Sequence, residues 1–566
     1  MIAEKVWLKS YPEGIPATID PELYGSLPQL LEESFSRFSE RKAYACMGST
    51  MSYREWDRHS RSLAAWLQQR GLSKGARVAV MLPNVLQYPI AVAAVLRAGF
   101  TVVNVNPLYT ARELEHQLAD SGAEAIFILE NFATTLEKVL PHTQVRHIVV
   151  ASMGDLLGFV KGPLVNFAVR KVKKMVPAFS LPDALPFRTV LRIGAGMELH
   201  KPGQGHEDIA FLQYTGGTTG LSKGATLTHR NVIANMLQND AWAGPALFKA
   251  SEGKQIVTVC ALPLYHILAL NACMLMGARW GALNLLVPNP RDMAGFAREL
   301  AKYRINFFPG VNTLFNALMN QPELAKVDFS GLRITLGGGM AVQQVVSERW
   351  LKLTGSPILE GYGLSETSPT ATLCRPDQQG FSGTIGLPVP STEVAILDDN
   401  GKPLPFGQPG EIAIRGPQVM AGYWRRPGET AAVMTADGYF KSGDIGIMDE
   451  QGYVRIVDRK KDMILVSGFN VYPTEVECVV AAHPMVLECA CIGVPDPDAG
   501  EAVKLFVVRR DQSLTGEQLM DYCRQQLTGY KKPKHIVFRE SLPKSNVGKI
   551  LRRELRDDLH QEKAAA

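Results

Sequence analysis

Cysteines and long apolar runs are scarce in this sequence of 566 residues. Its eight cysteines are too few to hold a chain of this length together, so a disulfide-rich secreted protein is excluded. The longest apolar run, residues 261–278, contains His266 and Asn271 and predicts a buried helix rather than a membrane span. The first residues also lack an apolar stretch followed by a small-residue cleavage site. We therefore expect a cytoplasmic protein with reduced cysteines.

A strong net charge is missing as well. Charged residues make up 20% of the chain and the formal net charge is +5, so the composition does not require a nucleic-acid partner. Apolar residues reach 46%, which excludes a mostly disordered chain, because disorder requires low hydrophobicity and high net charge. At roughly 100–200 residues per domain, the length allows three or four structural units, or one large domain with a small one.

The pattern of apolar residues up to position 460 predicts an α/β fold. Fully apolar, strand-like runs at 77–82, 100–105 and 123–129 alternate with helical stretches at 87–98 and 110–120. Such runs are typical of a parallel sheet whose two faces are both covered by helices.

A different pattern begins near Gly383. Short alternating strands such as 410–416 are broken by glycine and proline, and they predict a small antiparallel β-rich unit. The charge cluster at 458–462 then marks a boundary, so we expect an N-terminal domain at 1–460 and a C-terminal domain at 461–566. Within the latter, Thr474 and Glu477 predict a helix that opens in a capping box.

The segment Tyr214-Thr-Gly-Gly-Thr-Thr-Gly-Leu-Ser-Lys-Gly-Ala225 carries the strongest chemical signal and follows a strand-like run at 209–213. Its glycines let the backbone approach an anion, its hydroxyls and amides can donate to oxygens, and Lys223 adds positive charge. These are the requirements of a polyphosphate site. The segment is not a Walker P-loop, because two residues separate Gly220 from Lys223.

Three weaker segments add groups suited to a nucleotide. In 359–367, Tyr362 lies between two glycines and could stack on a base, while Glu366 is a hard oxygen ligand suited to Mg²⁺. Further on, Asp444 could accept hydrogen bonds from both hydroxyls of a ribose, and Lys549 lies on a glycine-containing loop. Alone, each has an ordinary structural explanation, such as a turn or a solvated surface lysine.

In this order and spacing, the segments resemble the adenylate-forming superfamily of acyl-CoA synthetases, luciferases and peptide-synthetase adenylation domains. The resemblance extends over essentially the whole chain. Within the superfamily, residues 437–462 resemble the fatty acyl-CoA synthetase signature. Three further segments, 6–12, 104–109 and 527–533, are similar to the bacterial long-chain fatty-acid–CoA ligases of β-oxidation. The departures are slight: Ser365 stands where many relatives have threonine, which preserves the hydroxyl.

The resemblance implies a large N-terminal domain of two α/β subdomains and a β-barrel-like subdomain, with a small mobile C-terminal α/β domain. It implies ATP, Mg²⁺ and coenzyme A as cofactor and co-substrates. A carboxylate would attack the α-phosphate of ATP to give acyl-AMP and pyrophosphate, and the thiol of coenzyme A would then release AMP.

The resemblance also implies roles for individual residues. The ATP/AMP site would consist of Tyr214, Thr215, Gly216, Gly217, Thr218, Thr219, Gly220, Lys223, Gly338, Gly339, Glu360, Gly361, Tyr362, Gly363, Ser365, Asp444 and Arg459. The catalytic residues would be Lys549, Glu366 and His266, and the metal ligands Glu366 and Thr218. Lys461 matches the hinge residue of relatives, and Ser467 and Gly468 would line the coenzyme A channel.

An acyl pocket would be lined by Tyr265, His266, Val311 and Phe315. Core packing explains the apolar members equally well, and a histidine at this position is also typical of a buried core residue. The sequence does not decide between the two interpretations.

Residues 164–176 predict an amphipathic helix. One face would carry Val165, Ala168, Val169, Val172 and Met175, with Arg170, Lys171, Lys173 and Lys174 elsewhere. An apolar stripe with basic flanks is typical of a helix lying in a membrane interface, and an apolar stripe is equally typical of a helix packed on its own domain.

The sequence thus predicts a long-chain fatty-acid–CoA ligase. A CoA ligase for medium-chain or aryl acids stays open, because the motifs bind ATP and not the acyl tail. A non-catalytic acyl- or membrane-binding protein is the other alternative, against which the intact Lys223, Glu366, Asp444 and Lys549 argue. The expected partners are small-molecule substrates, with peripheral contact with the inner membrane and a homodimer as further expectations, and no nucleic acid.

Overall fold

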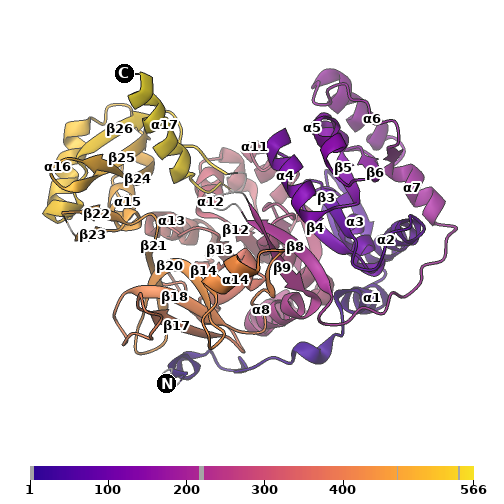
Figure 1. Cartoon of the computed structure of the whole chain (residues 1–566), viewed down its shortest axis with the longest axis horizontal. Coiled ribbons are helices and arrows are strands. Elements are labelled where there is room, and N and C mark those ends of the chain that lie inside the picture. The colour runs from indigo at the N-terminus through magenta and orange to yellow at the C-terminus, as the bar shows by residue number, and fades with distance from the viewer. Residues whose placement is uncertain (1–4, 216–221, 468, 546–547, 566) are drawn as a thin grey trace.

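The computed structural model describes residues 5–215, 222–467, 469–545 and 548–565, which form a large body and a smaller C-terminal unit (Figure 1). Within these residues the body holds two large, mainly parallel sheets and a smaller antiparallel sheet, while the C-terminal unit has a sheet of its own. The predicted α/β class, with a large N-terminal and a small C-terminal domain, is confirmed.

The first large sheet contains the strands predicted from the apolar runs. In spatial order it consists of β19 (Gly422–Tyr423), β9 (Lys223–Thr228), β8 (Ile209–Thr215), β4 (Thr101–Asn104), β3 (Arg77–Met81), β5 (Ala125–Leu129), β6 (His147–Ala151) and β7 (Leu185–Pro186). The predicted helices are α3 (Gln87–Arg97) and α4 (Ala111–Ser121). Helix α4 opens in the expected capping box, in which Thr110 and Glu113 each accept a hydrogen bond from the other's backbone N–H.

The second large sheet carries the strand ends that later form the candidate site. Its order is β16 (Leu387–Pro388), β15 (Thr370–Leu373), β14 (Ile358–Gly363), β13 (Ile334–Gly338), β12 (Phe307–Gly310), β10 (Val257–Cys260), β11 (Leu283–Leu286), β1 (Lys42–Cys46) and β2 (Ser49–Ser52). The strands from β1 to β14 along this order run parallel, so the carboxyl ends of β13 and β14 lie at the same edge.

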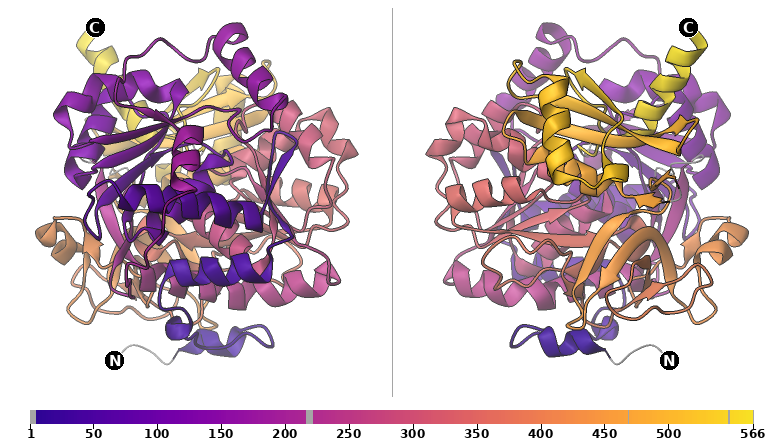
Figure 2. Two further views of the ribbon diagram at one scale, coloured as in Figure 1. Left: turned by 90° about the vertical axis from the view of Figure 1, so that its right-hand side faces the viewer. Right: turned by 90° about the vertical axis from the view of Figure 1, so that its left-hand side faces the viewer.

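Helices cover both sheets, as the left-hand view of Figure 2 shows for the N-terminal part. They include α1 (Leu27–Arg37), α2 (Tyr53–Gln68), α5 (Ala133–Val139), α7 (Phe187–Gly194), α8 (His229–Ser251), α11 (Met293–Leu300), α12 (Asn312–Met319) and α13 (Gln344–Thr354).

The apolar run at 261–278 is a buried helical segment, as predicted. It comprises α9 (Ile267–Ala269), the π-helical turn η6 (Leu270–Leu275) and α10 (Met276–Trp280). In the part of the chain that the structure describes, no helix has the length and apolar character needed to cross a bilayer.

Helix α8 ties the parts of the body together through buried amides. Asn235 and Thr370 exchange two hydrogen bonds, from Asn235 Nδ2 to the Thr370 carbonyl (2.8 Å) and from the Thr370 N–H to Asn235 Oδ1 (3.0 Å). Gln238 donates to the carbonyl of Pro390 at 2.8 Å. Because an unsatisfied buried amide is costly, these bonds fix β15 and the following β-rich unit relative to α8.

The predicted β-rich unit is an antiparallel sheet of β17 (Glu393–Leu397), β18 (Gly410–Arg415), β20 (Phe440–Met448) and β21 (Val454–Arg459). The right-hand view of Figure 2 shows the C-terminal unit above this sheet. That unit contains β23 (Phe469–Val471), β22 (Ile464–Val466), β25 (Gly500–Arg509), β24 (Val486–Asp496) and β26 (His535–Arg539), with α15 (Pro473–Ala481), α16 (Gly516–Gln526) and α17 (Arg552–Ala565). The boundary at 460/461 falls between β21 and β22 and stays a prediction.

The capping box predicted at Thr474 and Glu477 is wrong. Helix α15 begins one residue earlier, at Pro473, whose fixed φ suits the first helical position. The backbone N–H of Thr474 donates to Asp458 (2.7 Å), and the Glu477 carboxylate instead binds the Arg552 guanidinium (2.6 Å).

Arg552 lies at the centre of a buried charge cluster that joins α17 to the segment between the two units. Besides Glu477, its guanidinium lies 3.3 Å from the Asp462 carboxylate and 3.6 Å from that of Asp458. The three carboxylates are largely buried, so they depend on this one guanidinium for much of their neutralisation.

We expect Arg552→Met to lower the free energy of unfolding of the C-terminal unit by about 3–5 kcal/mol, because buried carboxylates lose their counter-charge. Native-state hydrogen exchange of the β24 and β25 amides measures this value. Arg553→Met is the matched control: that side chain is 60% exposed and pairs with exposed Asp557, so the expected change is within about 0.5 kcal/mol. Equal losses in both variants would show that the cluster does not stabilise the unit.

Candidate active site

Two glycine-rich strand ends form the floor of the candidate site. In the parallel pair β13–β14, Gly338 lies opposite Gly361. A Cβ on Gly338 would lie 3.2 Å from Leu268, and one on Gly361 only 2.7 Å from Leu373, so these positions have little room for a side chain. Gly339 follows with a φ of +77°, which turns the chain away at the strand end. Ligands of α/β sheets bind at such carboxyl ends.

Three predicted nucleotide residues meet beside this floor. The Tyr362 hydroxyl donates to Asp444 Oδ2 at 2.8 Å, and Arg459 Nε lies 3.2 Å from Asp444 Oδ1. Asp444 and Arg459 are cross-strand partners in β20 and β21. The buried carboxylate is therefore held from two sides, in an orientation suited to accept from neighbouring hydroxyls of a ligand.

Glu360 lies on β14 with its side chain buried. The backbone N–H of Val342 donates to its carboxylate at 3.1 Å. Burial nevertheless raises the pKa of Glu360 to about 7, so near neutral pH this carboxyl group can donate as well as accept a hydrogen bond.

Glu366 follows in the short turn η8 (Ser365–Thr367), next to the half-buried Ser365. Its carboxylate accepts a hydrogen bond from the Tyr423 hydroxyl at 2.7 Å, and burial raises its pKa. Among the described residues no three His, Cys, Asp or Glu side chains cluster as metal ligands. A single carboxylate fits Mg²⁺, which takes most of its ligands from phosphate oxygens and water.

Lys223 opens β9 opposite Thr215, the last residue of β8. Its ammonium forms an ion pair with Glu429 of α14 (Pro427–Val433) and lies 5.1 Å from the Tyr423 ring centroid. The predicted phosphate-binding residues Gly216, Gly217, Thr218, Thr219 and Gly220 lie outside the described residues. The two chain ends that carry this segment therefore stand next to Glu366 and Tyr423.

Tyr214, predicted as a ligand-binding residue, bonds within the protein. Its hydroxyl donates to Asp120 at 2.7 Å, and Arg426 binds the other carboxylate oxygen at 2.8 Å. Trp424 Nε1 donates to the Asp120 carbonyl at 3.2 Å. These contacts hold the β8–β9 hairpin against residues 422–429.

The loop of Lys549 reaches the body through its neighbour Gly548. The Thr313 hydroxyl donates to the Gly548 carbonyl at 3.2 Å, and Val311 packs beside it. Val311, predicted for the acyl pocket, therefore lies at the contact between the two units. Burial, assisted by the nearby charge of Arg459 and opposed by Asp444, lowers the pKa of Lys549 to about 8. The contact between Thr313 and Gly548 thus holds the loop of Lys549 against the body, where the charges of Asp444 and Arg459 act on its ammonium.

Lys461 lies near this cluster, since its charge helps to lower the pKa of Lys549, whereas Ser467 belongs to the following hairpin. Lys461 is exposed in the turn between β21 and β22, which the bond from the Asp462 N–H to the Arg459 carbonyl closes at 2.9 Å. Ser467 lies in the turn of the β22–β23 hairpin with a φ of +49°, and Gly468 lies outside the described residues. Figure 1 shows this hairpin on the outer side of the C-terminal unit, away from β13 and β14. In this arrangement of the two units, the loop of Lys549 lies against the body, whereas Ser467 lies away from the carboxyl ends of β13 and β14.

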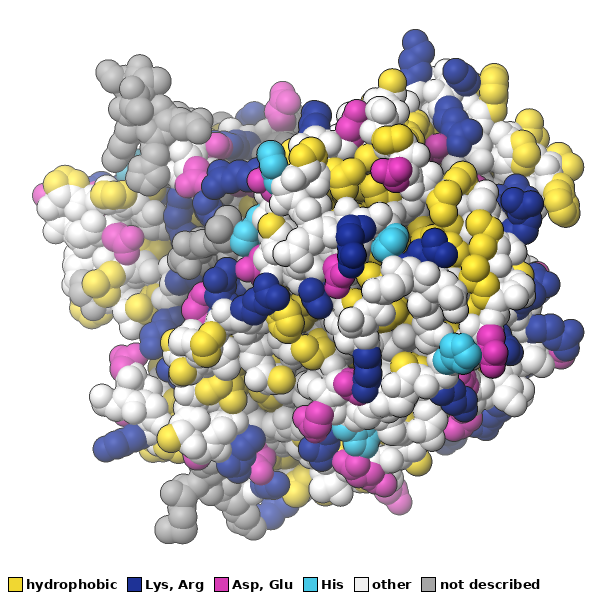
Figure 3. Space-filling view, turned by 45° about the vertical axis from the view of Figure 1, so that its right-hand side comes forward, with side chains coloured by type: hydrophobic (Ala, Val, Ile, Leu, Met, Phe, Trp, Pro, Cys, Tyr) yellow, Lys and Arg dark blue, Asp and Glu magenta, His cyan; other side chains and the backbone are white. Residues whose placement is uncertain are grey.

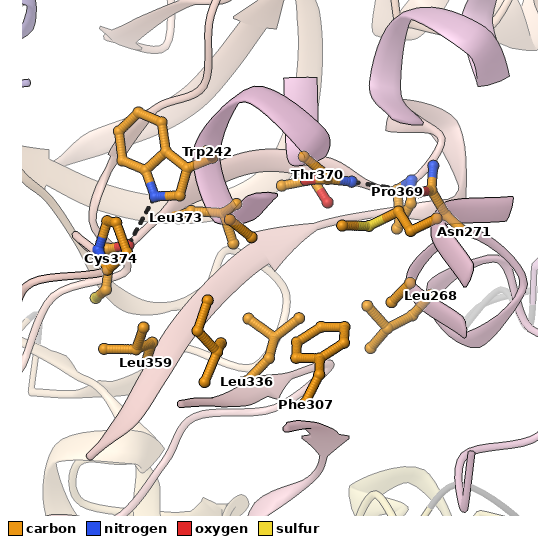
Figure 4. A pocket seen from close by; sticks show the side chains of 16 residues that line it. Trp242, Leu268, Asn271, Phe307, Leu336, Leu359, Pro369, Thr370, Leu373 and Cys374 are labelled. Atoms are coloured by element: carbon orange, nitrogen blue, oxygen red, sulfur yellow. Dashed lines mark hydrogen bonds between the residues drawn. The ribbon is translucent and has the colours of Figure 1, made fainter. Parts of the chain in front are cut away.

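An apolar cavity of about 30 Å³ lies behind the floor of the site (Figure 4). Leu268, which touches the position of a Cβ on Gly338, is part of its wall. At the other side, the Trp242 indole donates to the Cys374 carbonyl at 2.9 Å. Other lining residues come from α8, from the helical segment 267–280 and from neighbouring strands, including Ala243, Asn271, Ala272, Met276, Phe307, Leu336, Leu359 and Leu373.

The four residues predicted to line an acyl pocket do not line this cavity. Phe315 packs in the core, with ring centroids 5.5 Å from Phe308 and 4.9 Å from Trp350. His266 is half-buried beside Tyr265, with ring centroids 4.8 Å apart. Burial lowers the pKa of His266 to about 4, so the imidazole is neutral near pH 7.

A buried polar chain that the sequence did not reveal positions this histidine segment. The Tyr88 hydroxyl donates to Asn104 Oδ1 at 2.7 Å, and Asn104 donates to Gln213 Oε1 at 3.1 Å. Gln213 in turn donates to the Tyr265 carbonyl at 2.8 Å. Tyr423, Glu429 and Asp120 were likewise missed, because their partners lie far away in the sequence and no local pattern marks them.

Comparison with known proteins shows the family to which the chain belongs. The AMP-binding enzyme family matches residues 31–424, and the AMP-binding enzyme C-terminal domain matches residues 475–549. Over 556 residues and 98% of both chains, this chain is 57% identical to a long-chain-fatty-acid–CoA ligase of Yersinia pestis and 56% identical to one of Escherichia coli O6:H1 (strain CFT073).

A solved structure shares the fold. The crystal structure of an anthranilate CoA ligase in complex with anthranoyl-AMP superposes with a TM-score of 0.83 at 23% identity, covering 96% of this chain and 100% of the other. The chain therefore belongs to the AMP-binding enzyme family, the adenylate-forming superfamily whose motifs it carries.

Proposed function

We propose that this protein is a long-chain fatty-acid–CoA ligase, which forms acyl-CoA, AMP and pyrophosphate in two steps through acyl-AMP, and that its product enters β-oxidation. The observation that carries the proposal is the cluster of Tyr362, Asp444 and Arg459 at the strand ends, with the loop of Lys549 held against the body through Thr313 and Gly548. The high identity to ligases named for long-chain fatty acids, over nearly the whole chain, supports this substrate class.

In the first step the fatty-acid carboxylate attacks the α-phosphorus of ATP. A bond forms between carboxylate oxygen and phosphorus, the bond to the bridging oxygen breaks, and pyrophosphate leaves. Because both reactants are anions, the site must supply positive charge. Lys549, Arg459 and Ser365 would bind the α-phosphate. Lys223 and Thr215 would bind the β- and γ-phosphates. Mg²⁺ held by Glu366 would add charge at the triphosphate.

In the second step the thiol of coenzyme A attacks the acyl carbonyl carbon. The thiol proton passes to solvent, the bond to the phosphate oxygen breaks, and AMP leaves. AMP is a good leaving group, so this step requires positioning above all. We propose that the C-terminal unit rotates about Lys461, so that Lys549 leaves the site and Ser467 and Gly468 approach it. Hinges absorb such motion at very few residues.

We also propose peripheral contact with the inner membrane, since long-chain acids partition into bilayers. Association into a homodimer stays a prediction.

Pyrophosphate release with acids of increasing chain length tests the function directly. The proposed ligase should show its highest kcat/KM with palmitate or oleate. A maximum at octanoate or benzoate would establish the medium-chain or aryl alternative, and no release with any acid would establish a non-catalytic protein.

Lys549→Ala should slow acyl-AMP formation by about 10²–10³, as for the loss of one preorganised electrostatic contact. Thioester formation from supplied acyl-AMP should change little, so the two half-reactions are measured separately. Lys544→Ala is the matched control, because Lys544 lies nearby in the same unit and pairs with Glu488.

The same residue predicts a pH dependence. With a pKa of about 8, Lys549 loses its charge as the pH rises through that value, so kcat/KM for ATP should fall above pH 8. Lys549→Arg should remove this decline, because a guanidinium stays charged. An unchanged profile in that variant would assign the decline to another group.

A reversible cross-link tests the rotation. A Cβ on Gly548 would lie 3.7 Å from the Thr313 Cβ, within the range of disulfides, although the φ of +80° adds some strain. We expect the oxidised pair Thr313→Cys/Gly548→Cys to retain acyl-AMP formation and to lose most thioester formation, with recovery after reduction.

The thiol of coenzyme A can itself reduce the engineered disulfide, but this uncatalysed exchange takes minutes to hours. Thioester formation is therefore measured in the first minute after coenzyme A is added. The two single variants, treated with the same oxidant, are the controls. Normal thioester formation by the cross-linked protein would rule out the rotation.

The cavity predicts a residue that sets the chain length. Ala272 lines the cavity from η6. The cavity of about 30 Å³ must widen to admit a long acyl chain, and Ala272→Phe should block this widening and lower kcat/KM for palmitate by about 10–200-fold. The value for octanoate should change little. Ala243→Leu, on the α8 wall, is a second variant in case the first does not fold. If both variants lower the values for both acids equally, the acyl chain lies elsewhere.

A further inference from the structure

Large apolar side chains are exposed together on the segment around α6 (Lys161–Phe167) and the π-helical turn η5 (Ala168–Val172). Phe159 is 91% exposed, Leu164 63% and Phe167 61%. Val160, Val172 and Met175 are also more than half exposed. Figure 3 shows hydrophobic side chains gathered at this upper right edge of the molecule, with Lys and Arg beside them. We call these six residues the apolar ridge.

The ridge differs from the amphipathic face that the sequence predicts. Val165 and Val169 point inward, as expected, but Val172 and Met175 are exposed. The π-helical turn at 168–172 changes the residue spacing at Val172, and Met175 lies beyond the end of the helical segment, after Lys174 with a φ of +50°. The helix therefore buries one apolar side and still exposes another.

The inner side is firmly attached, so the exposed ridge does not result from a loose segment. Gly154 and Gly162 pack so closely that a Cβ on either would lie within 2.4 Å of the other's carbonyl oxygen. Arg170 binds the buried Glu130 carboxylate at 2.7 Å and Ser152 Oγ at 2.9 Å. These contacts attach the inner side of the segment to the body, and the ridge lies on its outer side.

The charges around the ridge are all positive. From residue 156 to residue 182 the sequence has five Lys and Arg and no Asp or Glu. Arg170 is used for the contact with Glu130, whereas Lys171, Lys173 and Lys174 are exposed next to Val172 and Met175. An apolar ridge with basic residues along its border matches the interfacial and charged layers of an anionic bilayer.

We infer that the apolar ridge is the membrane-docking element of this protein, with Phe159, Val160, Leu164 and Phe167 inserted among lipids and Lys171, Lys173 and Lys174 on anionic headgroups. The inference rests on the proposed function for its purpose, which is to bring a long-chain acid to the enzyme. The ridge and the C-terminal unit lie at opposite sides of the molecule in Figure 1, so docking leaves that unit free to move.

Flotation of the full chain with lipid vesicles tests the surface. The wild type should float with vesicles of phosphatidylcholine and phosphatidylglycerol. Phe159→Ser/Leu164→Ser/Phe167→Ser should reduce the partition coefficient by about 100-fold or more, because three inserted side chains are lost. Lys171→Gln/Lys173→Gln/Lys174→Gln should reduce it by about 100-fold on these vesicles, and far less on pure phosphatidylcholine.

Val345→Ser/Leu353→Ser is the matched control, because both residues are exposed apolar side chains on α13. It should float like the wild type. Equal flotation of the ridge variant and the wild type, or no flotation of the wild type, overturns the inference. A third result would also overturn it: the wild type sediments as a dimer, the ridge variant sediments as a monomer, and neither binds vesicles. The ridge would then be an interface between two copies of the chain.

Pyrophosphate release with soluble octanoate should be the same in all these variants. Flotation that depends on the ridge, in a protein that releases no pyrophosphate with any acid, would reject the proposed function and leave the docking surface intact. Normal pyrophosphate release without flotation that depends on the ridge would support the proposed function and reject the docking surface.

Discussion

The contact between Gly548 and Thr313 is the constraint on which the geometry of the candidate site depends. The carbonyl of Gly548 accepts from the Thr313 hydroxyl, and a side chain at position 548 would collide with that hydroxyl. This glycine therefore lets the C-terminal loop that carries Lys549 approach the body closely. The proposed role of Lys549 in the chemistry thus depends on the position of a whole unit.

Burial places the charged groups of the site in an unfavourable state before substrates arrive. It lowers the pKa of Lys549, where Arg459 acts in the same direction, and it raises the pKa of Glu360 and Glu366. A triphosphate and Mg²⁺ would relieve both effects, because each ligand supplies the missing opposite charge. Arg552 of the C-terminal unit likewise supplies a missing opposite charge. It neutralises the buried carboxylates of Asp458, Asp462 and Glu477, around the turn that contains Lys461.

The proposed acyl site and docking surface make different use of apolar residues. The cavity is enclosed by α8, the segment 267–280 and the strands of the second large sheet, so its shape depends on several parts of the body at once. The apolar ridge lies on a single segment of the chain, residues 159–175, whose inner side is anchored by Gly162 and Arg170. The proposed docking at the ridge and the proposed rotation of the C-terminal unit therefore involve separate parts of the molecule.

The amino-acid sequence alone determined the α/β class, strands such as β3, β4 and β5, the capping box at Thr110, and the candidate residues Lys223, Tyr362, Glu366, Asp444 and Lys549. These features follow from periodicity, capping and motif composition, which are properties of neighbouring residues. Only the tertiary structure decided that Tyr423 binds Glu366, that Glu429 pairs with Lys223, that Glu477 binds Arg552 rather than caps a helix, and that Phe315 packs in the core. The physical reason is that each of these contacts joins residues far apart in the chain, and its energy depends on burial and packing that exist only after the sheets have come together.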